Sequence, residues 1–237
     1  MPVYIESYKF MNTCSIYPLG DSAMTLDLGN CIDDQLNSRA LTIYDWLGAH
    51  PLEGITDRIV AYSSVSVFYD TTGIRNRTAV TEWLLEAWQR TDQIPKQSDG
   101  REISIPVCYE GEYAPDLEQV ARHTGLAAAE LVELHTSIEY RIYMIGFLPG
   151  FPYLGKLDRR LEVPRKARPV PVIAGGVGIA GMQTGVYPLN SPGGWQIIGR
   201  TPLRLFDRHA YPPILLRTGD RVRFYPVSTA DFMAWKP

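Results

Sequence analysis

The sequence has few cysteines and no long apolar run. Its three cysteines, Cys14, Cys31 and Cys108, are widely spaced and form no CxxC pair. Neither a disulfide framework nor a structural zinc site is therefore expected. No stretch reaches the length of a membrane span, and the first ten residues lack the pattern of a secretory signal. These absences predict a cytoplasmic protein without a membrane segment.

The chain also has no excess of basic residues. Its 237 residues carry a formal net charge of −3, which gives no general attraction to nucleic acid or to an anionic membrane. The hydrophobic content of 45% is ordinary for a globular protein, and the length allows one large domain or two smaller ones. Small molecules and other proteins are the expected partners, with no nucleic acid and no membrane.

Several common catalytic signatures are missing. Gly155-Lys156 is followed by Leu157 instead of serine or threonine, so no phosphate-binding P-loop is present. No spacing identifies a Ser-His-Asp or Cys-His arrangement, and the histidines have no companions that suggest metal ligation. No metal site is expected in this chain.

One apparent nucleotide motif is rejected on its context. Residues 176–181 read G-x-G-x-x-G, but the dinucleotide-binding pattern requires a helix immediately afterwards. Gly185 and Pro188 would break such a helix. Two interpretations remain open for this run, which are close backbone approach to a ligand or partner and a turn of a barrel.

Residues 1–92 are predicted to form one domain. The expected elements are strands over residues 14–18 and 23–28, a hairpin over residues 55–62 and 65–69, and helices that follow Asp33 and span residues 76–91. This order fits antiparallel strands covered by two helices on one face.

A polar segment, residues 93–101, is predicted to be a linker to a second domain, residues 102–237. Two short helices are expected over residues 116–123 and 127–134. Strands are expected over residues 102–108, 140–145, 170–173, 185–187, 196–199, 203–206, 214–216 and 221–225. Many short strands with Gly/Pro turns favour a closed barrel or a sandwich, and the whole chain is assigned to the α+β class.

Residues 135–200 are dense in glycine, proline and aromatic side chains. Three runs, residues 146–155, 175–181 and 191–195, predict shaped and rigid loops, because glycine permits positive φ or close approach and proline fixes φ. We expect these loops to wall one pocket. The predicted pocket residues are Phe147, Pro149, Phe151, Tyr153, Gly176, Gly178, Gln183, Tyr187, Ser191, Gly193, Gly194, Trp195 and Arg200.

Three residues of this region are candidates for chemistry. Arg165 and Arg168 lie in a segment stiffened by prolines, which suits bidentate recognition of a carboxylate or phosphate. The alternative for both is a solvated loop paired with surface acids. His135 is either a general acid/base or, more commonly for a histidine in this setting, a cap at a helix C-terminus.

The motifs of this region resemble those of a known family. They are His135, Tyr140, residues 146–154, Pro164-Arg165, Pro169-Val170, residues 174–181, residues 183–188, residues 191–195 and residues 198–202. Together they resemble the KipI/PxpB family, also described as allophanate hydrolase subunit 1 and as carboxyltransferase subdomains C and D. The resemblance extends from about residue 17 to residue 226. One position departs from it, because Gly176 stands where the family usually has serine.

The resemblance implies an N-terminal ferredoxin-like α/β sandwich followed by a cyclophilin-like β-barrel, without implying prolyl isomerase activity. It further implies the B subunit of the ATP-dependent 5-oxoprolinase, which converts 5-oxo-L-proline to L-glutamate. The implied partners are a KipA/PxpC-type subunit and a LamB/YcsF (PxpA)-type subunit, with ATP and Mg²⁺ used in the complex.

Two other functions are compatible with the same resemblance. One is the carboxyltransferase half of a urea carboxylase or allophanate hydrolase-like system, with a urea-like substrate. The other is inhibition of a sporulation-type histidine kinase. We expect a subunit that is inactive alone and supplies half of an active site, because no nucleophile triad or P-loop is present.

Overall fold

The computed structural model describes residues 8–10, 14–73, 77–92, 94 and 100–236. The chain divides into two compact units, Met1–Ser98 and Asp99–Pro237. The division falls inside the polar segment of residues 93–101. Among the described residues, no helix has both the length and the apolar character needed to cross a membrane.

The N-terminal unit contains one antiparallel sheet of five strands in the order β1-β2-β3-β5-β4. The strands are β1 (Tyr8–Phe10), β2 (Cys14–Pro18), β3 (Ala23–Asp27), β4 (Ile55–Ala61) and β5 (Ser64–Tyr69). Alternate residues of β5 are buried, as expected for a sheet with one covered face. The strand and hairpin predictions for this unit are confirmed to within two residues.

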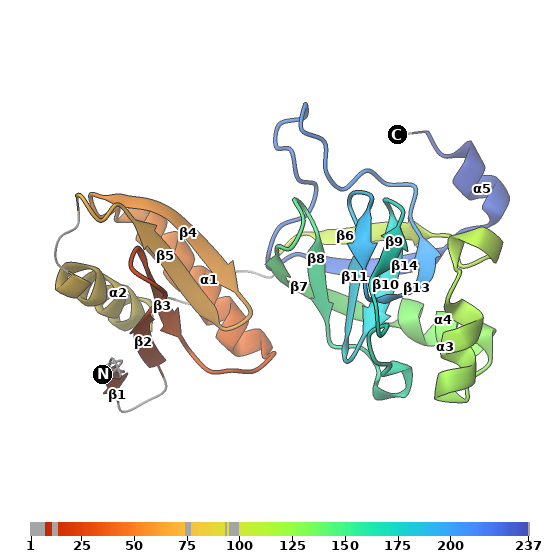
Figure 1. Cartoon of the computed structure of the whole chain (residues 1–237), viewed down its shortest axis with the longest axis horizontal. Coiled ribbons are helices and arrows are strands. Elements are labelled where there is room, and N and C mark those ends of the chain that lie inside the picture. The colour runs from red at the N-terminus through yellow and green to blue at the C-terminus, as the bar shows by residue number, and fades with distance from the viewer. Residues whose placement is uncertain (1–7, 11–13, 74–76, 93, 95–99, 237) are drawn as a thin grey trace. The chain divides into compact units, whose positions relative to one another are not determined.

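Two helices, α1 (Asp34–Ala49) and α2 (Arg77–Thr91), cover one face of this sheet. In Figure 1 the strands β4 and β5 lie in front of α1. The Asp33 carboxylate starts α1 by accepting the backbone N–H groups of Gln35 and Leu36 at 2.9 and 3.0 Å. Apolar side chains of both helices join those of the sheet in one core. Helical periodicity in the sequence predicted this arrangement.

The C-terminal unit is a nearly closed barrel. Its seven-stranded sheet has the order β13-β10-β11-β8-β7-β14-β6. The strands are β6 (Glu102–Val107), β7 (Glu139–Ile145), β8 (Pro152–Gly155), β10 (Gly176–Ala180), β11 (Gln183–Val186), β13 (Gln196–Arg200) and β14 (Arg221–Pro226). All neighbours are antiparallel except β14 and β6. The two edges meet where Cys108 and Arg200 exchange backbone hydrogen bonds of 2.8 and 2.9 Å.

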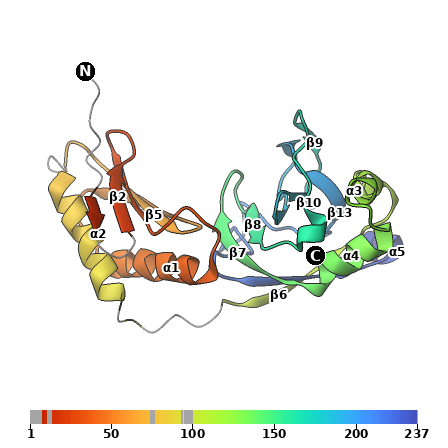
Figure 2. The ribbon, with the colours of Figure 1, turned by 90° about the horizontal axis from the view of Figure 1, so that it is seen from below.

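Shorter elements surround this barrel. The helices α3 (Leu117–Thr124), α4 (Ala128–Ser137) and α5 (Thr229–Ala234) lie at one end of the unit in Figure 2. Two single turns of 3₁₀ helix, η1 (Gly111–Tyr113) and η2 (Arg159–Leu161), precede α3 and follow β8. A separate two-stranded ribbon pairs β9 (Val170–Val172) with β12 (Ser191–Gly193). This ribbon projects from the barrel and carries part of the site described below (Figure 2).

Several expectations for the second half are wrong in detail. The segments 203–206 and 214–216 form no strands and are joined only by an isolated bridge between Phe206 and Ile214. Residues 176–180, expected as a loop or turn, are strand β10. Parts of the other two glycine runs are strands β8 and β12. Glycine in the neighbouring strand β11 gives space to a large side chain, since a Cβ at Gly185 would lie only 2.8 Å from the Phe151 ring.

Candidate functional site

An aromatic pocket of about 250 Å³ opens between the barrel and the β9/β12 ribbon. We use the name aromatic pocket for the cavity lined by Phe147, Phe151, Tyr153, Arg165, Lys166, Pro169, Tyr187, Pro192, Gly193, Gly194 and Trp195. Eight of these residues were predicted from the sequence. The lining therefore combines residues of two glycine- and proline-rich runs, 146–155 and 191–195, with Arg165 and Tyr187. The third run, residues 175–181, contributes no residue to it.

The walls of this pocket are rings that pack edge to face. Phe151 is central, with ring centroids 4.8 Å from Tyr153, 5.1 Å from Tyr187 and 5.5 Å from Trp195. Phe151, Tyr187 and Trp195 also belong to a small buried cluster beneath the pocket. Phe147 is 60% exposed, and its ring centroid lies 5.7 Å from that of Phe151. Such contacts fix the ring orientations, so the cavity is rigid before any ligand enters.

Arg165 places a positive charge beside these rings. Its guanidinium carbon lies 5.9 Å from the centre of the Trp195 ring, within the range of a cation–π contact. No ion pair joins Arg165 to a carboxylate in the part of the chain that the structure describes. The guanidinium therefore remains able to pair with an anion in the cavity.

Lys166, the next residue, is held differently. Its Nζ lies 2.6 Å from a carboxylate oxygen of Asp116, which also accepts the Ile197 backbone N–H at 2.6 Å. The Lys166 backbone N–H donates to the Gly194 carbonyl at 2.7 Å. These bonds attach the arginine-bearing loop to α3, to β13 and to the end of β12, and they hold Arg165 over the pocket.

The two phenols of the pocket are neutral at pH 7. Burial raises the pKa of Tyr153, although the nearby Arg165 charge acts in the opposite direction. Burial also raises the pKa of Tyr187, whose hydroxyl accepts the Trp195 backbone N–H. Both hydroxyls can donate or accept a hydrogen bond, but neither is a base at this pH.

Gly193 and Gly194 differ in what surrounds them. A Cβ at Gly193 would overlap the Tyr187 hydroxyl and lie 2.7 Å from two carbons of its ring. At Gly194 the nearest atoms to a Cβ would be 3.9 Å away or more. Gly193 is therefore required by the close approach of Tyr187, whereas Gly194 is not sterically constrained.

His135 does not reach this pocket. It is fully buried near the end of α4, with Nδ1 2.8 Å from the Tyr109 hydroxyl and Nε2 2.9 Å from the Thr184 hydroxyl. Thr184 donates onward to the Gly178 carbonyl at 3.1 Å, which makes Nε2 the protonated nitrogen. Burial lowers the pKa of His135 from 6.5 to about 3. The structure thus removes His135 from the groups that can act on a ligand in the aromatic pocket.

The other predicted site residues lie outside the lining of the aromatic pocket. Pro149 and Arg168 are exposed, Gln183 begins β11, and Ser191 begins β12 with a buried hydroxyl. Gly176 and Gly178 are buried in β10, where Gly178 lies against the Trp195 Cβ. Arg200, at the end of β13, lines a second cavity of about 610 Å³.

Sequence reasoning missed three residues of the aromatic pocket, Lys166, Pro169 and Pro192. All three lie beside residues that were predicted. The prolines were interpreted only as rigid elements of the loops, and Lys166 only as part of a basic segment. Their position in the lining follows from the pairing of β9 with β12, which brings Pro171 opposite Pro192.

The family of carboxyltransferase domains, subdomains C and D, matches residues 14–216. The chain belongs to this family. It is 43% identical over 232 residues to the B subunit of 5-oxoprolinase from Bacillus subtilis, with 93% of this chain and 96% of that protein covered. It is 41% identical to the B subunit of 5-oxoprolinase from Escherichia coli O157:H7, with 91% and 97% covered.

A solved structure with the same fold is the Kluyveromyces lactis urea carboxylase, with a TM-score of 0.76 and 22% identity. The alignment covers 93% of this chain and 22% of that chain. A serine would have little room at Gly176, because a Cβ there would lie 2.8 Å from Val172 Cγ1. Within the described residues, no group of three or more His, Cys, Asp and Glu side chains could hold a metal ion.

Proposed function

We propose that this protein is the B subunit of a cytoplasmic, ATP-dependent 5-oxoprolinase. The observation that carries the proposal is the identity of 43% to the B subunit of 5-oxoprolinase from Bacillus subtilis, which extends over nearly the full length of both chains. Such a complex opens the lactam ring of 5-oxo-L-proline to give L-glutamate. Its lactam carbonyl is a poor electrophile, so activation with ATP is chemically reasonable.

The aromatic pocket suits a small lactam with a carboxylate. The substrate ring is flat and small, and it fits between the rings of Phe151, Tyr187 and Trp195. The Arg165 guanidinium supplies a bidentate partner for the carboxylate. The phenols of Tyr153 and Tyr187 are neutral donors for the lactam oxygen or nitrogen. These residues bind and orient the substrate, which lowers the entropy cost of the reaction.

The pocket contains substrate-binding groups but no nucleophile or base. Its titratable groups are Arg165, Lys166 and two neutral phenols. We therefore propose that the chain acts with a KipA/PxpC-type subunit and a LamB/YcsF-type subunit, which complete the active site and use ATP with Mg²⁺. Arg168, which is exposed in the same loop as Arg165, is proposed to meet the substrate or a partner subunit in that complex.

The test is an assay of 5-oxoproline-dependent ATP hydrolysis by this chain co-expressed with both partner subunits. Arg165→Gln should lower kcat/KM at least about tenfold, because a charge-assisted hydrogen bond is lost. The matched control is Arg159→Gln, an exposed arginine outside the pocket, which should leave the rate unchanged. Arg168→Gln, measured in the same assay, shows whether the second arginine of the loop also contributes to kcat/KM.

Two results count against the proposal. A complex that assembles but does not hydrolyse ATP in the presence of 5-oxoproline would contradict the function. An active complex in which Arg165→Gln has the wild-type kcat/KM would leave the function in place and remove the role of Arg165.

A finer fold assignment accompanies this function. We propose that the N-terminal unit is ferredoxin-like, since the succession β3–α1–β4–β5–α2 gives three adjacent strands in the order β3-β5-β4. The fourth position of that fold, beside β3, is filled by β2, which precedes the motif instead of following α2. The barrel of the second unit is proposed to be cyclophilin-like.

The family description supports one alternative. A carboxyltransferase domain would transfer a carboxyl group to a urea-like acceptor, and the same flat pocket with Arg165 would accept it. This function requires a biotin-carrying partner. Co-purification of a biotinylated protein with this chain, together with no response to 5-oxoproline, would favour it.

A further inference from the structure

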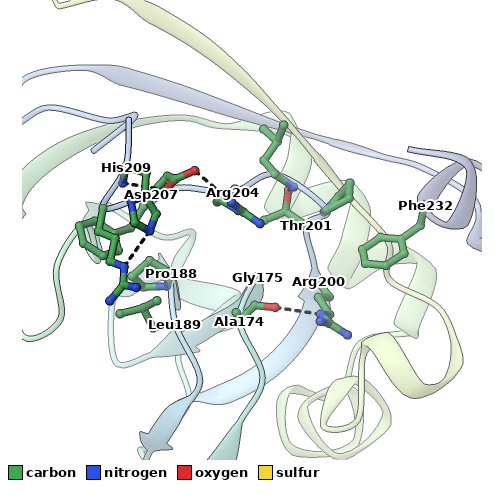
Figure 3. Close-up of a pocket in the computed structure, with 14 residues that line it drawn as sticks. Ala174, Gly175, Pro188, Leu189, Arg200, Thr201, Arg204, Asp207, His209 and Phe232 are labelled. Carbon is green, nitrogen blue, oxygen red and sulfur yellow. Dashed lines mark hydrogen bonds and ion pairs between the residues drawn. The ribbon is translucent and has the colours of Figure 1, made fainter. Parts of the chain in front are cut away.

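A second cavity is lined by the turn at residues 174–175 and by residues of the segment 200–209. We call it the arginine pocket, because Arg200, Arg204 and Arg208 line it. Its volume of about 610 Å³ exceeds the 250 Å³ of the aromatic pocket. Figure 3 shows Arg200, at the end of β13, and Arg204, four residues later, with Phe232 beyond Arg200. Nothing in the proposed lactam chemistry uses these residues.

The arginine pocket is positively charged, whereas the whole chain has a negative net charge. Three arginines face one carboxylate, Asp207, in a protein with a net charge of −3. Asp207 is already engaged, since one oxygen accepts the His209 backbone N–H at 2.9 Å and the other accepts Arg204 Nη1 at 3.0 Å. The remaining guanidinium groups leave a concentrated positive charge that favours an anion.

Arg200 is the most firmly held of the three arginines. Its backbone closes the barrel through two hydrogen bonds to Cys108, and its Nε donates to the Ala174 carbonyl at 2.9 Å. No hydrogen bond or ion pair of its two terminal nitrogens is found among the described residues, so both are available to a ligand. Because the side chain is already ordered, an anion that binds it loses little affinity to side-chain entropy.

Arg208 is oriented by its neighbour. Its Nε donates to Nε2 of His209 at 2.9 Å, and since a guanidinium is always protonated, Nε2 must be the acceptor. The two terminal nitrogens of Arg208, which also lines the cavity, make no ion pair within the described residues and remain as donors.

An aromatic ring completes the lining. Phe232 of α5 packs on Tyr113 with ring centroids 4.3 Å apart, and the Arg200 guanidinium lies 5.8 Å from its centre. Pro188 and Leu189 add apolar surface. A ligand that matches this lining combines several negative charges with a flat apolar group.

We infer that the arginine pocket binds a nucleoside phosphate, with the phosphates on Arg200, Arg204 and Arg208 and the base against Phe232. No P-loop is involved, and the phosphates are held by side chains instead of a glycine-rich loop. The inference deepens the proposed function, because an ATP-dependent reaction requires such a site. It is nevertheless testable on this chain alone, without partners or 5-oxoproline.

The experiment is titration calorimetry of the purified full-length chain with ATP, tripolyphosphate and adenosine. We expect saturable binding of ATP, weaker binding of tripolyphosphate at the same site, and weak or no binding of adenosine. The double variant Arg204→Gln/Arg208→Gln should weaken ATP binding about a hundredfold, since each lost guanidinium–phosphate contact corresponds to about tenfold. Both side chains are exposed, so the fold should not depend on them.

Two further variants make the test specific. Arg122→Gln, at an exposed arginine of α3, is the matched control and should bind ATP as the wild type does. Phe232→Leu should weaken ATP binding and leave tripolyphosphate binding unchanged. Absence of saturable ATP binding, or equal affinity of the double variant and the wild type, would overturn the inference. Equal affinities for ATP and tripolyphosphate would overturn the assignment of the base to Phe232. None of these results would decide whether the assembled complex hydrolyses 5-oxoproline.

Discussion

His135 is a buried, uncharged histidine whose proton affinity depends on the fold. Its pKa falls from 6.5 to about 3 because burial disfavours the imidazolium. The unfolded chain therefore binds a proton between these values that the folded chain does not. The contribution of His135 to the free energy of unfolding is therefore complete above pH 6.5 and is lost as the pH falls toward 3.

We predict that the free energy of unfolding falls by about 2 kcal/mol from this group alone between pH 7 and pH 5. The measurement is urea denaturation of the wild type and of His135→Gln at both values. The variant should be less stable at pH 7, because Tyr109 and Thr184 lose a partner, and its stability should change less with pH. Equal pH dependence in the two proteins would contradict the assigned pKa.

Gly193 and Gly194 offer a matched pair of substitutions. Gly193→Ala should destabilise the protein by about 1–3 kcal/mol, because its Cβ overlaps the Tyr187 hydroxyl and forces the ring to move. Gly194→Ala adds the same methyl group into open space and should change the melting temperature little. Thermal unfolding followed by tryptophan fluorescence compares the two. Equal losses would show that the Tyr187 contact does not determine the effect.

For individual residues, the sequence predicted which side chains line the aromatic pocket better than it predicted which groups can react there. Aromatic residues among glycines indicated a wall, and eight of the predicted residues lie in one lining. The burial of His135 could not be predicted, because it depends on Thr184 and Tyr109, which lie 49 and 26 residues away along the chain. Periodicity within one helix gives no information about such partners.

The loop that carries Arg165 is held by the ion pair between Lys166 and Asp116. Asp116→Asn removes the charge and keeps the shape, so the partly buried Lys166 loses its partner. We expect a loss of about 1–3 kcal/mol in the free energy of unfolding, measured by chemical denaturation. KM for 5-oxoproline in the assembled complex should rise as well, because Arg165 precedes Lys166 and loses its fixed position when the loop is released.

The comparison for this prediction is Asp158→Asn, which weakens the solvent-exposed pair with Arg160. Exposed pairs are screened by water, so little change is expected there. A similar loss at both positions would mean that the Asp116 pair does not anchor the loop.

Elements were predicted well where periodicity was strong and poorly where glycine dominated. Leu36, Ala40, Ile43 and Leu47 repeat at helical spacing and lie in or pack on the N-terminal core. Strand β10, by contrast, has glycine at two of five positions, and the sequence indicated a loop. Those glycines leave room for side chains of other strands, such as Ile197 of β13 beside Gly178, and this packing cannot be deduced from the local sequence. Residues 203–206 were predicted to be a strand because they are apolar. Leu205 is buried, but it lies in a segment that forms no strand, so burial alone accounts for the apolar pattern.

The whole molecule has two separate sets of core residues. The N-terminal core involves only residues of the first unit, and the barrel core and the cluster beneath the aromatic pocket involve only residues of the second. We predict that residues 100–237 fold when expressed alone. Circular dichroism and a cooperative thermal transition would test this.

Residues 100–237 contain Trp195 and Trp235, so the fragment is studied with Trp235→Phe, in which the signal comes from Trp195, a residue buried in the aromatic pocket. Its fluorescence should match that of a folded protein and change on unfolding. A fragment with exposed tryptophan and no cooperative transition would contradict independent folding. The boundary at residues 93–101 was indicated by composition alone, since the segment is polar and lacks periodicity.

Tyr187 and Pro188 are consecutive residues, and each lines a different cavity. The Tyr187 carbonyl accepts the Gly175 N–H at 2.7 Å, so one backbone hydrogen bond joins a residue that lines the aromatic pocket to a residue that lines the arginine pocket. We predict that a ligand that displaces this hydrogen-bonded pair on entering one cavity changes the affinity of the other cavity. Thermodynamic linkage then requires the same factor in both directions. The measurement is each saturation curve with the other ligand both absent and saturating, and identical curves in the two conditions would show that the cavities are independent.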